Sequence, residues 1–185
     1  MNDKNLATAS EIVTFWRDAG PAAWFKKDDA FDATIRERFM PAYEAAAGGK
    51  LSAWEGHAEG ALALLILLDQ FPRNMFRGSP RMFETDPMAR SIAAGALVRG
   101  FDAETPPEMR SFFYLPFEHS ESLADQERSV ALFHATGDAE LIKWADIHAD
   151  IVRKFGRFPH RNAVLGRATT PEEQAFLDEE ASFKG

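Results

Sequence analysis

The sequence predicts an all-α protein: a single-domain bundle of about eight helices that spans residues 1–185. Three observations carry this prediction. Helix-capping residues and helix breakers alternate densely along the chain. Apolar residues recur at helical spacing, and no stretch alternates as a strand would. The 16 Phe and four Trp supply enough apolar surface for the core of one domain of this length.

The N-terminal third predicts two helices. Residues 1–9 are expected to fray, and Ser10 is expected to cap a first helix that stops at Gly20-Pro21. Pro41 is expected to kink or split the second helix. That helix is indicated by four apolar residues at helical spacing: Phe31, Ile35, Phe39 and Tyr43.

The next helix is predicted to occupy the middle of the bundle. Ser52 and Glu55 have the spacing of a capping box, which would open a helix that runs to Asp69. Residues 61–68 of this segment are apolar without interruption. A helix that is apolar on all sides is typically surrounded by other helices.

The middle of the chain predicts two further helices. Asp86-Pro87 is predicted to be the N-cap and first residue of a helix that Gly100 ends. Thr105-Pro106 is predicted to open a shorter helix that ends before Pro116.

The C-terminal third predicts three more helices. Ser122 and Asp125 have capping-box spacing, Asp138 is expected to cap a helix that ends at Gly156, and Thr170-Pro171-Glu172-Glu173 is expected to begin the last one. The middle helix of these three has a predicted inner stripe that consists of Leu141, Trp144, Ala145, His148, Ile151, Val152 and Phe155.

Composition excludes several classes of protein. The absence of Cys excludes disulfides, a thiol nucleophile and zinc–thiolate or iron–sulfur sites. A net charge of −8 disfavours nucleic-acid binding. The longest apolar run, residues 61–68, is far shorter than the roughly 20 residues that cross a membrane. The first ten residues contain no apolar segment of a signal peptide. We therefore expect a cytoplasmic protein that binds neither nucleic acid nor membrane.

Charge is segregated along the chain. Residues 70–83 and 151–170 hold eight of the 21 basic residues and none of the 29 acidic ones. Cations gather near helix C-termini because the helix dipole favours them there. The alternative is that the two segments together form an anion-binding pocket.

Three predicted helix exits resemble one another: residues 69–74, 115–121 and 156–162. The first and third share Phe-Pro followed by Arg-Asn, and the second contains Pro-Phe. Phe71, Phe117 and Phe158 are 46 and 41 residues apart, close to the length of a helix-pair repeat. Stacked helix pairs return their exits to one side, so we expect Asp69, Glu118 and Arg161 to be neighbours.

The segments FWRDAG, WFKKDDAFD, LDQFPRNMFRG, LPFEHSE and FGRFPHRNAVLGR, in this order, resemble the bacterial proteins of domain-of-unknown-function family 924. The resemblance covers about residues 11 to 183. It implies a tetratricopeptide-like superhelix of α-helices. It carries over no activity and no catalytic residue.

The second exit contains residues that could bind a metal or act in catalysis. Glu118, His119 and Glu121 could bind a divalent metal, or act as a base and the group that orients it. Alternatively, His119 is a packed histidine and Glu121 supports the helix N-terminus near Ser122.

The third exit holds the other candidates. His148 lies on the apolar stripe of its helix, where a histidine is more often part of the core than a ligand. His160 and Arg161 follow a tight exit that can fold back over that helix. Arg73-Asn74 and Arg161-Asn162 could clamp one anion between them. Alternatively, each Arg pairs with an internal carboxylate, Asp69 or Glu118.

Three functions remain open, and the sequence does not decide whether the protein is an enzyme. The first is a binding module for a small anionic ligand or a carboxylate-bearing peptide. Its candidate residues are Asp69, Arg73, Asn74, Glu118, His119, His148, Arg157, His160, Arg161 and Asn162. The second is a hydrolase or lyase that uses His119, Glu121 and His160, with or without a metal. The third is a scaffold that binds a protein partner. No nucleotide-binding loop, zinc-protease motif or serine elbow is present. No metal site is assigned, and the cofactor and oligomeric state stay undetermined.

Overall fold

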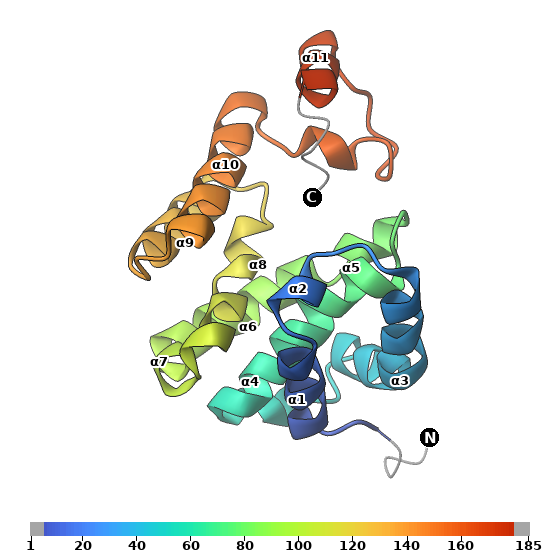
Figure 1. Ribbon diagram of the computed structural model, residues 1–185, viewed down its shortest axis with the longest axis vertical. Coiled ribbons are helices and arrows are strands. Elements are labelled where there is room, and N and C mark those ends of the chain that lie inside the picture. Colours follow the sequence, from blue (N-terminus) through green and yellow to red (C-terminus); the bar gives the residue numbers. More distant parts are fainter. Residues whose placement is uncertain (1–5, 180–185) are drawn as a thin grey trace. The chain divides into compact units, whose positions relative to one another are not determined.

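The computed structural model describes residues 6–179, and every regular element in that range is a helix (Figure 1). The prediction of an all-α chain is confirmed. Of the segment expected to fray, residues 1–5 lie outside the described range. None of the helices within residues 6–179 combines the length and the apolar character that crossing a membrane requires.

The described chain forms two compact units. Unit 1 consists of residues 6–77 and 81–116, and unit 2 consists of residues 78–80 and 117–179. The predicted single domain and tetratricopeptide-like superhelix concern the assembly of the whole chain, and both stay predictions. In chain order the helices are α1 (Ala9–Ala19), α2 (Pro21–Trp24), α3 (Asp29–Ala47), η2 (Ser52–Gly56), α4 (Ala58–Leu65), η3 (Ile66–Gln70), α5 (Phe71–Met75), η4 (Pro80–Phe83), α6 (Asp86–Val98), α7 (Phe101–Glu104), η5 (Pro107–Phe113), α8 (Leu115–Glu118), α9 (Leu123–His134), α10 (Ala139–Phe155), η6 (Pro159–Arg161) and α11 (Pro171–Glu179).

Helix α1 begins two residues earlier than the sequence suggested. Thr8 is its N-cap and forms a capping box with Glu11, whose carboxylate accepts the Thr8 N–H at 2.7 Å. The assignment of Ser10 as the cap is wrong, because Ser10 lies inside the first turn. The helix ends before Gly20, whose φ of 74° suits glycine. Helix α3 continues unbroken past Pro41, so the helix is not split there.

A 3₁₀ helix precedes α4, so the predicted capping box of Ser52 and Glu55 is also wrong. His57 caps α4 instead, because its Nδ1 accepts the backbone N–H of Gly60 at 3.0 Å. The sequence pattern predicted that the Ser52 hydroxyl would cap this helix, but the His57 imidazole accepts the capping hydrogen bond. Gly60 is required at this bend, since a Cβ there would lie 2.3 Å from the Trp54 carbonyl oxygen.

The segment that follows is the buried centre of unit 1, as predicted: residues 61–68 are at most 2% exposed. Helix α4 passes directly into the π-helical turn η3 and then into α5. Pro72 has no N–H to give to the carbonyl one turn earlier. The Leu68 carbonyl instead accepts the Thr85 hydroxyl at 2.6 Å. This bond fixes the start of α6 against the π turn.

The predicted caps around α6 and α7 are only partly right. Asp86 is the first residue of α6 rather than its N-cap, and its carboxylate binds Arg73. Gly100 follows the helix in the left-handed conformation, as expected. Thr105 closes α7, because its hydroxyl donates to the Phe101 carbonyl at 2.9 Å, and the next segment is the 3₁₀ helix η5.

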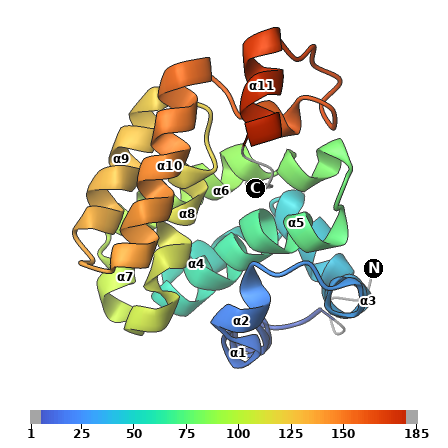
Figure 2. The same ribbon diagram turned by 45° about the horizontal axis from the view of Figure 1, so that its top comes forward.

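Unit 2 is built on α9 and α10, which lie side by side in Figures 1 and 2. Asp138 caps α10 by accepting the N–H groups of Glu140 and Leu141, and Gly156 ends it with a φ of 69°. Both ends agree with the sequence prediction. The capping box at Ser122 is wrong, because Asp125 accepts the hydroxyl of Ser120 at 2.6 Å.

The inner stripe of α10 is largely as predicted. Ala145, Ile151 and Val152 are buried, and the last two pack with Phe158. Trp144 is the exception. It is 39% exposed and its indole N–H donates to the Glu140 carboxylate at 2.9 Å, so it belongs to the outer face of the helix.

Candidate functional site

Unit 2 brings together five of the candidate residues: Glu118, His119, His148, His160 and Arg161. They come from α8, the turn after it, the middle of α10 and η6. The His148 Nδ1 atom lies 3.5 Å from Glu118 Oε1. The five residues are called the histidine cluster below.

The buried ring of Phe158 is the packing centre of this cluster. The His148 ring meets it edge-on at 5.6 Å, and the His160 ring lies 5.5 Å from it. The Arg161 guanidinium carbon sits 4.5 Å from the ring centroid. A single aromatic side chain thus holds two imidazoles and one guanidinium next to each other, which favours the cationic group electrostatically.

His148 has a defined protonation state. Its Nδ1 lies 2.8 Å from the Trp144 carbonyl oxygen. A carbonyl only accepts, so the proton of the neutral ring is on Nδ1 and Nε2 carries the lone pair. Burial, together with electrostatic repulsion from His119, His160 and Arg161, outweighs the bond to the Trp144 carbonyl and lowers the pKa of His148 to about 3. His148 is neutral at pH 7.

Glu121, the predicted catalytic carboxylate, holds the third exit in place. It accepts the Phe158 backbone N–H at 2.8 Å and both arms of Arg167, at 2.8 and 3.0 Å. Burial alone would raise the pKa of Glu121, but the bonds from Arg167 and Phe158 outweigh it and lower that pKa. The suggested support of the helix N-terminus near Ser122 is replaced by this link between distant segments.

Arg157 and Asn162 are bound to a carboxylate that the sequence analysis missed. Glu173 on α11 accepts Arg157 at 2.6 and 2.8 Å, Asn162 Nδ2 at 3.1 Å and the Thr170 N–H at 2.8 Å. The capping-box spacing of Thr170 and Glu173 was the sequence signal. These contacts dock α11 against the third exit.

Gln126 is a second residue that sequence reasoning missed. It is fully buried on α9, and its Nε2 donates to the carbonyls of Glu118 and Ser120, each at 2.6 Å. The backbone on both sides of His119 is thereby fixed. A glutamine in mid-helix gives no sequence signal for such a role.

The first exit belongs to unit 1. Arg73 Nη1 lies 3.3 Å from Asp69 Oδ1, so the pairing alternative is present for this arginine. Its fork also binds Asp86 at 3.0 and 3.1 Å, and Asn74 donates to Asp32 at 2.7 Å. Asp69, Arg73 and Asn74 thus lie together in unit 1, while the second and third exits converge in unit 2. The meeting of all three exits stays a prediction.

Distant carboxylates neutralise several arginines of the two acid-free segments. Arg77 binds Asp32 and Arg81 binds Glu44, each at 2.8 Å, in the same way that Arg167 binds Glu121. The charge segregation of the sequence is therefore largely cancelled where the chain folds. Within residues 6–179, no group of three or more His, Asp or Glu side chains has an arrangement that could hold a metal ion.

Comparisons with known proteins agree with the resemblance in the sequence. The model of DUF924, described as a bacterial protein of unknown function, matches residues 12–181. A solved structure of a protein of unknown function from Agrobacterium tumefaciens is 50% identical, with a TM-score of 0.90 over 92% of this chain and 97% of that one. The comparison with curated proteins gives no match. Because this family model matches nearly the whole chain, the chain belongs to the DUF924 family of bacterial proteins.

Proposed function

We propose that the histidine cluster of unit 2 binds a small anionic ligand, a carboxylate or a phosphate. The observation that carries this proposal is the convergence of His119, His160 and Arg161 around His148 and Phe158. A group of cation-forming side chains held by packing is preorganised for an anion, because little ordering is needed on binding.

The side chains of the cluster have different tasks in this proposal. Arg161 supplies a permanent charge and a planar fork that matches carboxylate or phosphate. His119 and His160 add ring N–H groups that can donate hydrogen bonds to the anion. His148 stays neutral and supports the site by packing on Phe158. We also propose that the protein is cytoplasmic, as the sequence analysis expects.

Calorimetry with inorganic phosphate, acetate and citrate tests the proposal. We expect His160→Gln and His119→Gln each to weaken binding by about tenfold, since a charge-assisted hydrogen bond is lost. His134→Gln is the matched control. This histidine lies in the same unit, but it is half exposed and pairs with Asp146 at 3.0 Å. If none of the three anions binds, or if the control weakens binding equally, the proposal is overturned.

The contact between Glu118 and His148 favours a second candidate, a hydrolase or lyase. A carboxylate 3.5 Å from the Nδ1 atom of a neutral imidazole can orient that ring as a general base. In this version Glu118 and His148 take the place of Glu121, which Arg167 binds. Hydrolysis of p-nitrophenyl phosphate or acetate by the untagged protein, lost in His148→Gln, would support it. Equal rates in the variant would exclude it.

A further inference from the structure

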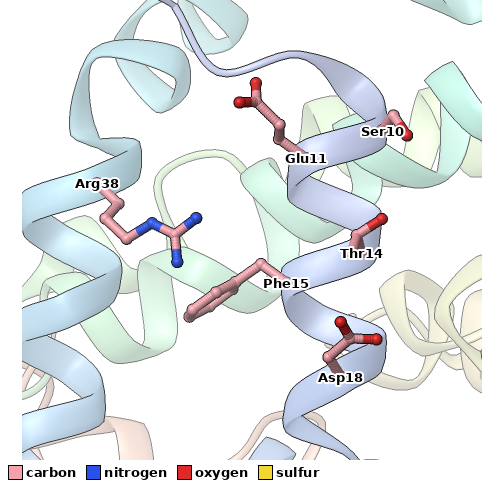
Figure 3. Close-up of a pocket in the computed structure, with 6 residues that line it drawn as sticks. All are labelled: Ser10, Glu11, Thr14, Phe15, Asp18 and Arg38. Carbon is pink, nitrogen blue, oxygen red and sulfur yellow. The ribbon is translucent and has the colours of Figure 1, made fainter.

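A groove in unit 1 is lined by residues that are not part of the histidine cluster. It has a volume of about 350 Å³ and runs between α1 and α3. Figure 3 shows Arg38 reaching from α3 toward Phe15 on α1, with Glu11 on the same helix. The lining residues are Ser10, Glu11, Thr14, Phe15, Asp18 and Arg38.

Aromatic rings hold Arg38 in this groove, and the Glu11 carboxylate lies close enough to feel its charge. Its guanidinium carbon lies 4.7 Å from the Phe15 ring centroid and 4.9 Å from that of Phe39. Among residues 6–179 no acceptor takes its N–H groups. Its neighbour Arg36, in contrast, donates to the Met75 carbonyl at 3.1 and 2.8 Å. Arg38 therefore presents a planar fork of donors that is held in position and available to a ligand.

The two carboxylates of the groove each keep one oxygen for a ligand. Glu11 uses Oε2 for the capping box with Thr8, and Asp18 uses Oδ1 for Arg17. Glu11 Oε1 and Asp18 Oδ2 accept no hydrogen bond within the described part of the chain. The groove thus offers a guanidinium fork that donates no hydrogen bond within residues 6–179, and two carboxylate oxygens that accept none there.

This balance of charge selects the class of ligand. A dianion such as phosphate would gain from Arg38 but would be repelled by Glu11 and Asp18. A zwitterion matches both, because its carboxylate fits the guanidinium fork and its ammonium group fits the carboxylate oxygens. The hydroxyls of Ser10 and Thr14 and the ring of Phe15 complete a wall for a small side chain.

We propose that the groove between α1 and α3 binds a small zwitterion, a free amino acid or a short peptide, with its carboxylate on Arg38. The site is separate from the histidine cluster and does not depend on the function proposed for it.

The test follows the Arg38 side-chain N–H signal by NMR in ¹⁵N-labelled protein, assigned by its loss in Arg38→Gln. The probes are alanine, alanyl-alanine, acetate, methylammonium and inorganic phosphate. We expect alanine or the dipeptide to shift this signal in a saturable way at millimolar concentration. Arg38→Gln should weaken the binding, followed on backbone signals of α1, by about 10- to 100-fold. A stronger response to the dipeptide than to alanine would identify a peptide as the ligand, and the reverse order would identify a free amino acid.

Two further variants separate the zwitterion from simpler explanations. Asp18→Asn should weaken alanine binding and strengthen acetate binding, because it removes one negative charge from the groove. Arg128→Gln is the matched control, since Arg128 stacks on Phe117 at 4.3 Å but does not line the groove. The proposal is overturned if no probe shifts Arg38, if phosphate or acetate binds as well as alanine, or if Asp18→Asn affects both ligands alike.

Discussion

Arg73 binds Asp86 with both arms of its guanidinium group, at 3.0 and 3.1 Å, and so links α5 to the first turn of α6. The side chains of Arg73 and Asp86 are 18% and 8% exposed, and Asp69 completes the network. A charge that is largely removed from water depends on such partners, because its desolvation is otherwise uncompensated. Asp69 of η3, Arg73 of α5 and Asp86 of α6 therefore act as one polar unit within an apolar core.

Replacing Asp86 by Ala should destabilise the protein by about 2 kcal/mol, since within residues 6–179 Arg73 then keeps Asp69 as its one carboxylate partner. Urea denaturation measures this difference. Asp150→Ala is the control, because the Asp150–Arg153 pair has the same chemistry at 2.8 Å but is exposed. We expect no measurable change for the control. Equal losses in both variants would contradict the role of burial.

Gly60→Ala should be destabilising although alanine favours helices. Its Cβ would lie 2.3 Å from the Trp54 carbonyl oxygen and 2.7 Å from the His57 ring, so the cap of α4 must move, at a cost of about 1–3 kcal/mol. Gly95→Ala in α6 should instead stabilise by about 0.5–1 kcal/mol, because only the flexible end of Arg99 approaches, at 3.4 Å. Thermal unfolding compares the two variants. A stabilised Gly60→Ala would refute the proposed close approach.

The burial of neutral His148 should make folding sensitive to acid. In the unfolded chain this histidine binds a proton near pH 6.5, whereas in the folded protein its pKa is lowered to about 3. Stability is therefore present in full above pH 6.5 and decreases as the pH falls toward 3, because the unfolded state binds more protons there. Urea denaturation from pH 7 to 4 should show a shallower loss in His148→Gln than in the original protein. Parallel curves would show that His148 is already charged when folded.

Acid should also weaken the docking of α11, through protonation of Glu173. The bonds from Arg157, and then those from Thr170 and Asn162, outweigh burial and lower the pKa of Glu173 from 4.5 to about 2. A carboxylate with a lowered pKa stabilises the folded state above pH 4.5, and this contribution is lost as the pH falls toward 2. Hydrogen exchange of the α11 amides should accelerate over that interval. Glu173→Gln should give fast exchange already at pH 7, and unchanged exchange would contradict the docking role.

The sequence by itself determined the all-α class and several helix ends. Asp138, Gly156 and Gly100 act within one turn of their own helix, so local chemistry was sufficient to place them. The apolar run 61–68 identified the buried centre, because a helix that is apolar on all sides must be surrounded by other elements. The cluster of His119, His148, His160 and Arg161 was foreseen in part, since tight exits and recurring Phe-Pro motifs indicated segments that fold back.

Tertiary structure decided which polar groups pair. Asp86 was expected to cap a helix, and Glu121 to act in catalysis or to support a helix N-terminus. Their carboxylates instead bind Arg73 and Arg167, which are 13 and 46 residues away. Capping by a hydroxyl contributes about 1 kcal/mol, whereas a partly buried arginine without a carboxylate costs several, so the distant partner prevails. No local pattern shows that competition, because it depends on which segments the packed apolar core brings within reach.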